Sequence, residues 1–234
     1  MRNKRLNNKL IRIITLLTGL FLTAIIYSQE AQESDLLYNA TIRADVEAAK
    51  KALAEGADIN RQSDNGYTAL MWASTYSSRS PYDEVAKFLI SEGAAVNIRA
   101  NDGSTALLEA AENSKEITLM LVEKGADITA RRDDGRGIFT SCIFGILMGA
   151  TDIELAEFML SKGADVNETA TSGDVENWAA IHYAASNGNK ELISFLIKKG
   201  ADVNAKTAEG KTPLSLVGSK NPEIIEILKV AGAE

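Results

Sequence analysis

The chain has 234 residues, 45% of them hydrophobic and 24% charged, with only three prolines, a composition that excludes a largely disordered protein. Five of its basic residues and none of its acids lie in residues 1–28. Without that segment, Lys+Arg falls from 25 to 20 against 32 acids, so the net charge moves from −7 to −12. A body this acidic argues against a nucleic-acid partner, because binding the phosphate backbone requires a basic face.

The first predicted element is an export segment. A basic head is followed by an uncharged run of 15 residues from Ile13 to Tyr27, which is shorter than the ~20 residues that span a bilayer and typical of a signal peptide. Cleavage is expected between Ser28 and Gln29, although Ile26 departs from the small residue preferred three positions before the cut. We expect a periplasmic or secreted protein that leaves the membrane once residues 1–28 are removed. The alternative is an inner-membrane protein anchored by an uncleaved segment.

A five-residue motif then recurs along the chain. It reads GADIN at 56–60, GAAVN at 93–97, GADIT at 125–129 and GADVN at both 163–167 and 200–204, and the chain stops on GAE at 232–234. Successive glycines of this series are 32 to 38 residues apart. A motif that returns at this interval indicates a repeat architecture, in which stacked units form one elongated body.

Each unit has the pattern of two helices. Apolar residues lie eight and four positions before each motif glycine, as on one face of a helix, and the glycine itself is a typical helix stop. Downstream, a tight-turn sequence such as DNG or NDG precedes TAL at 68–70 and 105–107 and TPL at 212–214. Threonine there can cap a helix, and Pro213 falls at the first helical position. The order is therefore turn, helix, loop, helix, glycine.

These motifs in register resemble ankyrin repeats. The segments GYTALMWAS, GSTALLEAA, WAAIHYAASNGNKELISFLIKKGADVN and GKTPLSLV are similar to the family pattern over about residues 34–234. The resemblance implies an all-α solenoid of helix pairs joined by β-hairpin-like loops. We expect an ankyrin-repeat domain over 29–234 with about six units: 34–64 as N-terminal cap, 65–101, 102–133, 134–170, 171–207 and 208–234 as C-terminal cap.

No residue pattern indicates an enzyme, a metal site or another cofactor. His182, the single histidine, is at the position where the resemblance implies a histidine that braces the loop, and nothing marks it as part of a catalytic triad. Cys142 aligns with small core residues and is expected to be buried rather than reactive. One His and one Cys are too few for structural zinc, and DDGRG at 133–137 lacks the spaced acids of a calcium loop.

The resemblance also implies a partner-binding surface, made of hairpin tips and first helices along a concave face. Tyr, Trp and Arg are enriched among interface hot spots, so such residues at these positions are the predicted contacts. They are Tyr67, Tyr76, Arg131, Arg132, Arg136, Trp178, Trp72 and Tyr183. Trp72 and Tyr183 lie within first helices and fit a packing role equally well.

The sequence therefore predicts a non-enzymatic, exported and monomeric module that binds a protein partner through its concave face. The repeats use nearly all of residues 29–234, which leaves no room there for an added catalytic domain. Alternatives are an accessory or envelope-stress factor for a periplasmic enzyme, a secreted effector acting on a host protein, and a hydrolase that uses His182.

Overall fold

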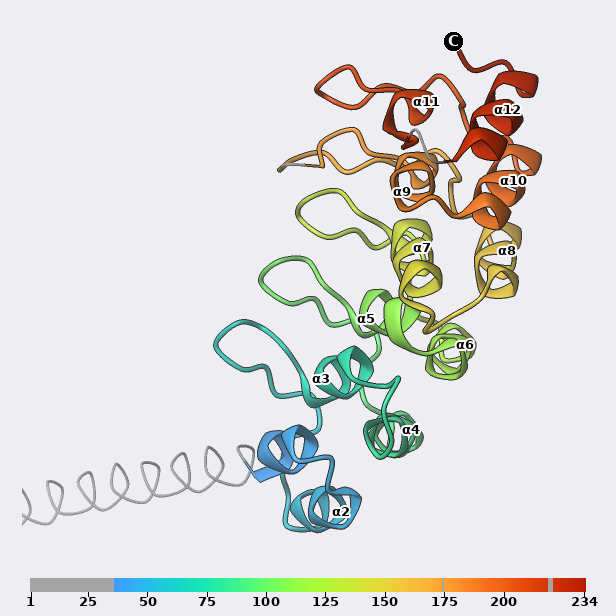
Figure 1. The fold of residues 1–234 in the computed structure, drawn as a ribbon. Helices are drawn as coiled ribbons and strands as arrows, with labels where there is room; N and C mark the ends of the chain where they lie inside the picture. Colours follow the sequence, from blue (N-terminus) through green and yellow to red (C-terminus); the bar gives the residue numbers. More distant parts are fainter. Residues whose placement is uncertain (1–35, 174, 219–220) are drawn as a thin grey trace, which may run out of the picture.

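The computed structural model describes residues 36–173, 175–218 and 221–234, and the expected signal peptide lies outside them. It is a stack of helix pairs (Figure 1). A helix over residues 36–42 precedes α2 (Val46–Ala54). The later pairs are α3 (Ala69–Thr75) with α4 (Tyr82–Ser91), α5 (Ala106–Asn113) with α6 (Lys115–Glu123), α7 (Ile138–Met148) with α8 (Ile153–Ser161), α9 (Ala180–Asn187) with α10 (Lys190–Lys198), and α11 (Pro213–Leu216) with α12 (Pro222–Val230).

The first helices of the pairs form an inner row and the second helices an outer row, and the hairpin loops project from the inner row (Figure 1). The stack curves so that the hairpins and inner helices lie on its concave side. Each inner helix packs on the next, α3 on α5 and α5 on α7. In the part of the chain that the structure describes, the only β pairing is an isolated bridge between Thr169 and Ala179. The predicted all-α fold is confirmed.

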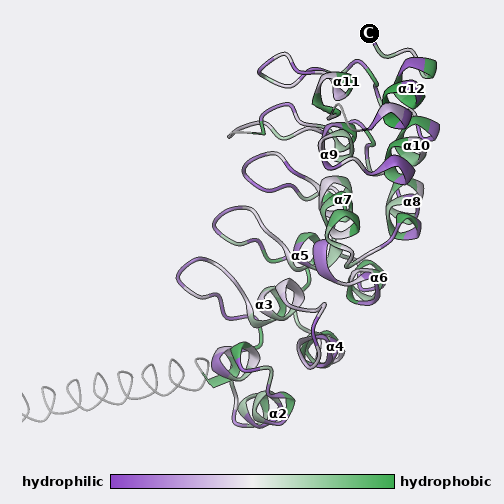
Figure 2. Ribbon diagram, viewed as in Figure 1, coloured by the Kyte–Doolittle hydropathy of each residue, from purple (hydrophilic) through white to green (hydrophobic). Residues whose placement is uncertain are grey.

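The core runs between the two rows as a continuous apolar layer (Figure 2). The apolar pairs predicted on the outer helices are buried, because each pair faces its own inner helix and the neighbouring units. They are Val85 and Leu89, Ile117 and Leu121, Leu155 and Met159, Leu192 and Leu196, and Ile224 and Leu228. The pair expected in the first unit is an exception: Ala52 is buried, whereas Ala48 is partly exposed at the end of the stack.

The recurring motif fastens each unit to the next. All six motif glycines have φ between +81° and +102°, a region that glycine enters without strain. The motif asparagines reach across units: Asn97 Nδ2 donates to the Gly125 carbonyl (3.1 Å), and its Oδ1 accepts from the Asp127 amide (2.8 Å). Asn167 makes the same two bonds to Gly200 (3.2 Å) and Asp202 (2.9 Å). The motif therefore combines a helix stop with an inter-unit clamp.

Helix starts follow the threonine pattern where threonine is present. The hydroxyls of Thr68, Thr105 and Thr212 accept from the third amide of the helix that each precedes. The start of α7 has Gly137 instead, with no side chain to cap it. There the buried carboxylate of Glu168, which follows α8 near the end of the same unit, accepts from the Thr140 amide at 2.6 Å. A residue distant along the chain thus supplies the missing cap.

Candidate partner-binding surface

Equivalent positions of successive inner helices line the concave side. Four residues after each helix N-cap lie Trp72, Glu109, Ser141 and Tyr183, and seven residues after it lie Thr75, Glu112, Phe144 and Ser186. The hairpins add Tyr67, Arg136 and Trp178, each of which directly precedes the N-cap residue of its helix. This row is aromatic near both ends and carries its charged residues in the middle.

The middle of the row is a hydrogen-bonded network around Glu109, which is 6% exposed. Its carboxylate accepts from the Tyr67 hydroxyl (2.9 Å), the Thr75 hydroxyl (3.1 Å) and Arg132 (3.0 Å). Burial, reinforced by the negative charge of Glu109, raises the pKa of Tyr67 to about 12. Two predicted contact residues, Tyr67 and Arg132, are therefore held in place by bonds within the protein.

Arg132 also binds Glu112, in the next turn of α5, at 3.0 Å. The Ser141 hydroxyl donates to the same Glu112 oxygen, Oε1, at 3.1 Å. Burial raises the pKa of Glu112, and the positive charge of Arg132 opposes this. Arg131 differs from Arg132: its side chain is 46% exposed and pairs with Glu168 at 3.2 Å, at the capping site of α7.

An aromatic cluster joins units four and five. The ring of Tyr183 lies 4.8 Å from Phe144 and 5.1 Å from Trp178, centroid to centroid, and the Arg136 guanidinium lies 5.4 Å from the Phe144 ring. Arg136 Nε donates to Asp134 at 2.7 Å. Tyr183 is 8% exposed, and burial raises its pKa to about 12. Tyr183 is therefore a packing residue, whereas Trp178 and Arg136 remain partly exposed on the rim.

A second aromatic cluster lies near the N-terminal end of the array. The Trp72 ring is 6.0 Å from Tyr38 and 5.1 Å from Tyr76, and Tyr76 lies 5.3 Å from Tyr82. The predicted residues Trp72 and Tyr76 are both partly exposed, and they contact each other. The predicted contacts thus fall into three groups along the concave side, with Arg131 apart from them.

A groove of about 530 Å³ lies between the middle network and the aromatic cluster of units four and five. It is lined by Ser78, Glu112, Asn113, Arg136, Phe144, Met148, Gly149 and Ala150. Of these lining residues, only Arg136 is among the predicted contacts, and the sequence analysis missed Met148, which is 80% exposed. The signal was the length of the apolar run in unit four: α7 has 11 residues where α5 has 8, and Met148 ends its extra turn.

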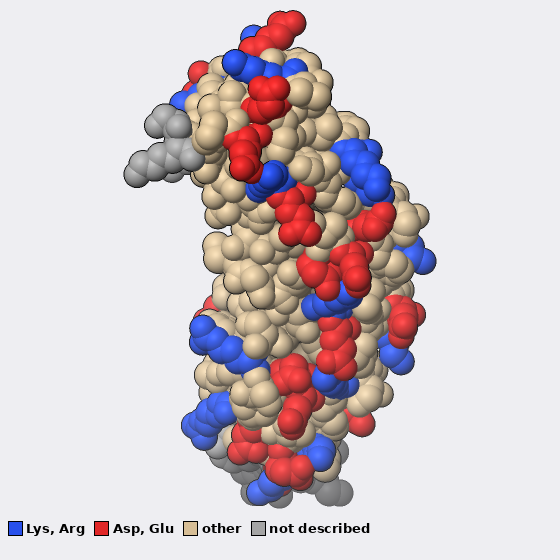
Figure 3. Space-filling model, turned by 45° about the vertical axis from the view of Figure 1, so that its right-hand side comes forward, with Lys and Arg blue, Asp and Glu red and all other residues tan. Residues whose placement is uncertain are grey.

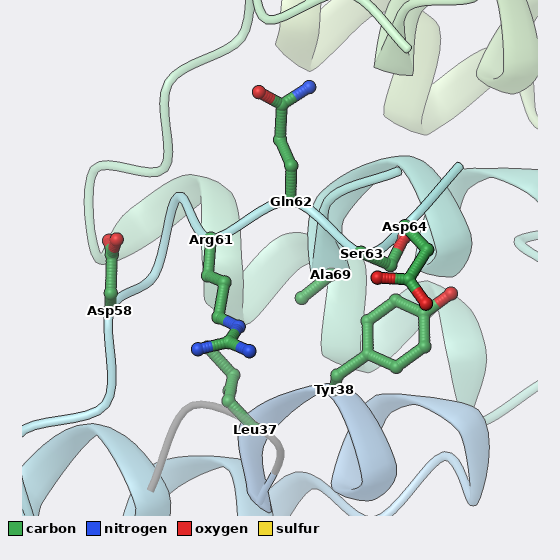
Figure 4. A pocket seen from close by; sticks show the side chains of 8 residues that line it. All are labelled: Leu37, Tyr38, Asp58, Arg61, Gln62, Ser63, Asp64 and Ala69. Carbon is green, nitrogen blue, oxygen red and sulfur yellow. The ribbon is translucent and has the colours of Figure 1, made fainter. Parts of the chain in front are cut away.

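A smaller pocket of about 240 Å³ lies at the N-terminal end. Asp58 and residues 61–64 of the first hairpin lie over Leu37 and Tyr38 of the first helix, with Ala69 beside them (Figure 4). It contains none of the predicted contact residues, and neither His182 nor Cys142 lines it.

His182 and Cys142 have structural surroundings. His182 is fully buried; its Nδ1 accepts from the Ala179 amide and its Nε2 lies against the Ala205 carbonyl, both at 3.0 Å. It therefore braces the next hairpin loop, as the resemblance implied, and burial lowers its pKa. Cys142 is fully buried, which raises the pKa of its thiol. Among the described residues, no group of three or more His, Cys, Asp or Glu side chains could hold a metal.

The convex side differs in chemistry from the concave side. Figure 3 shows acidic and basic side chains interspersed in a band along the outer helices. Ion pairs link successive outer helices: Lys87 with Glu116, Lys115 with Glu154, Lys199 with Glu157, and Lys190 with Glu223. These charges already have partners within the protein, and exposed pairs of this kind contribute little to stability.

No helix in the described ranges is long and apolar enough to span a bilayer.

Comparison with known proteins identifies the family. A family model described as ankyrin repeats in three copies matches residues 36–132 and 146–234. The chain belongs to the ankyrin-repeat family. Ankyrin-repeat proteins are protein-binding modules and are typically not catalytic. A search of curated proteins found no match.

One similar solved structure is a complex of the predatory endopeptidase Bd0816 from Bdellovibrio bacteriovorus with immunity protein Bd3460. Its ankyrin-repeat immunity protein is 27% identical to this chain with a TM-score of 0.68, and the match covers 84% of this chain and 98% of that one. The ankyrin-repeat protein in that complex is therefore bound to a protease.

Proposed function

We propose that this ankyrin-repeat protein is an exported, non-enzymatic module that docks one protein partner on its concave side. The groove beside Met148 carries the proposal. Met148 is a large apolar side chain, 80% exposed, next to the partly buried Phe144 and Arg136. Exposed apolar surface beside aromatic and arginine anchors is typical of interaction sites. On the convex side, by contrast, the charged side chains of the outer helices pair with one another.

The mechanism is occupancy of the partner by a preformed surface. Tyr67, Thr75 and Arg132 are fixed on Glu109 before any partner arrives. A surface whose side chains are already ordered loses little conformational entropy on binding, which favours affinity. No bond is made or broken in this mode of action, so the fully buried His182 and Cys142 are not required for it.

Among partners, an enzyme is the candidate that the comparison favours. The similar immunity protein is described in complex with an endopeptidase. By analogy, this chain would bind a peptidase or another hydrolase outside the cytoplasm and block or regulate its substrate site. A secreted effector that binds a host protein is the second candidate, and it uses the same surface.

The test is affinity capture from extracts of the protein's own cell, followed by calorimetry with the purified partner. Met148→Asn removes apolar contact area from the groove, and we expect it to weaken binding about tenfold. Val230→Asn is the matched control, because Val230 on α12 is 79% exposed, as Met148 is 80% exposed, but lies outside the groove. A partner that binds both variants as tightly as the unmodified protein refutes the concave site.

Export is tested separately, by determining the N-terminal residue of the protein recovered from its cell. A mature chain that begins at Gln29 agrees with cleavage of residues 1–28. A chain that retains those residues and fractionates with membranes refutes cleavage and leaves the anchored alternative. This result is independent of which surface the partner occupies.

A further inference from the structure

Three inner helices end at the groove. Ser78 lies just beyond the end of α3, Asn113 is the last residue of α5, and Met148 is the last residue of α7. A helix C-terminus carries a partial negative charge of about half a unit, because its last carbonyls point outward. The ends of α5 and α7 therefore add negative potential to the groove wall from the backbone.

Gly145 brings two of these helix ends together. A Cβ at Gly145 would lie 2.7 Å from the Ala111 carbonyl oxygen and 3.1 Å from that of Glu112. The absence of a side chain therefore allows α7 to lie directly against the last turn of α5. This close approach explains why the carbonyl ends of α5 and α7 border the same groove.

The charged side chains that line the groove are Glu112 and Arg136, one of each sign. Glu112 pairs with Arg132, which also pairs with Glu109, and Arg136 pairs with Asp134. Together these five side chains carry three carboxylates against two guanidiniums. Glu112 lines the groove with a side chain that is 24% exposed. Its Oε1 accepts from Arg132 and Ser141, while its Oε2 accepts no hydrogen bond from the described residues. One carboxylate oxygen thus remains open to a donor.

We propose that the groove receives a lysine or arginine side chain of the protein partner. The cationic end would bind Glu112 Oε2 beside the helix C-termini, and the aliphatic stem would lie on Phe144 and Met148. This inference rests on the proposed function and specifies the chemistry of the same surface. The net charge of −12 for residues 29–234 acts in the same direction, because an acidic body steers a basic partner toward it.

The test uses a phage-displayed library of random dodecapeptides as probe. The library is selected for binding to the protein purified from its own cell. We expect the enriched peptides to share a lysine or arginine, and its replacement by norleucine to weaken binding about tenfold. Glu112→Gln should weaken binding by a similar factor, because it keeps an acceptor for Arg132 but removes the negative charge. Glu116→Gln is the matched control, since Glu116 is an exposed acid on the convex side, paired with Lys87.

Met148 gives a second test that does not depend on folding, because its side chain is exposed. Met148→Lys should weaken binding of the selected peptides and Met148→Glu should strengthen it, each by about fivefold at low salt, and both effects should shrink as salt is added. Effects of the same sign for the two variants overturn the proposal.

The other possible results of the peptide selection and of the Glu112 and Met148 variants also test the proposed basic occupant. Selection of peptides without a basic residue, selection of no peptide, or equal effects of Glu112→Gln and Glu116→Gln would each overturn the basic occupant. A partner that depends on Met148 but not on the charge of Glu112 would refute this inference and leave the concave docking site intact. A partner insensitive to both positions would refute the docking site itself.

Discussion

Replacing Asn167 by alanine should loosen the junction between the motif of unit four and the motif of unit five. The change removes the bond to the Gly200 carbonyl (3.2 Å) and leaves the Asp202 amide without its acceptor (2.9 Å). Both bonds are exposed, so water replaces part of what is lost. At about 0.5–1 kcal/mol for each bond, the free energy of unfolding should fall by about 1–2 kcal/mol. For a chain of this size, that lowers Tm by about 2–8 °C.

Thr129 provides the matched comparison, because it stands where the other complete motifs have asparagine. Its hydroxyl donates to Asp127 within its own unit (2.7 Å) and does not reach the next copy. Thr129→Ala should therefore cost less than Asn167→Ala. Thr129→Asn should raise the free energy of unfolding by about 1 kcal/mol, because the Gly163 carbonyl and Asp165 amide make no other hydrogen bond among the described residues.

The assay is urea unfolding followed by far-UV circular dichroism, with hydrogen exchange to show which units open first. Exchange should accelerate most near Gly200 and Asp202 in Asn167→Ala. Two results would contradict the clamp: an Asn167→Ala variant no less stable than Thr129→Ala, or a Thr129→Asn variant no more stable than the unmodified chain.

Further predictions concern the glycine stop and the buried side chains of His182 and Cys142. Gly163→Val should lower the free energy of unfolding by about 1–2 kcal/mol through strain alone, since φ is +102° and no atom lies within 4 Å of an added Cβ; unchanged thermal unfolding would contradict this. Burial lowers the pKa of His182, so the unfolded chain binds a proton there more readily than the folded chain does. The free energy of unfolding should therefore decrease as pH falls below about 6.5, by up to about 1.4 kcal/mol per pH unit. Urea titrations of His182→Asn should show a weaker dependence on pH. Cys142, fully buried, should react with a thiol reagent only after unfolding; rapid labelling of the native protein would refute its burial.

The sequence by itself determined the fold. Glycine at a helix stop, threonine at a helix start and apolar pairs four residues apart are local rules, each satisfied within about a dozen residues of chain. Their return every 32 to 38 residues fixes the stacked arrangement, because one helix pair cannot bury its apolar face alone. Alignment of the repeats predicted burial of Cys142, and the resemblance to ankyrin repeats implied the bracing position of His182. The clamp role of the motif asparagine was not predicted, since its partners lie in the next unit.

The tertiary structure alone decided which surface is available to a partner. Residue type and position did not separate Trp72, which remains partly exposed, from Tyr183, which is buried, because burial of Tyr183 depends on the neighbouring unit's Phe144. The Glu109 network and the groove at Met148 likewise join side chains from different units, and the Glu168 cap joins residues 28 positions apart. Spacing along the chain gives the face of a helix on which a residue lies, but the side chains it meets depend on how adjacent repeats pack.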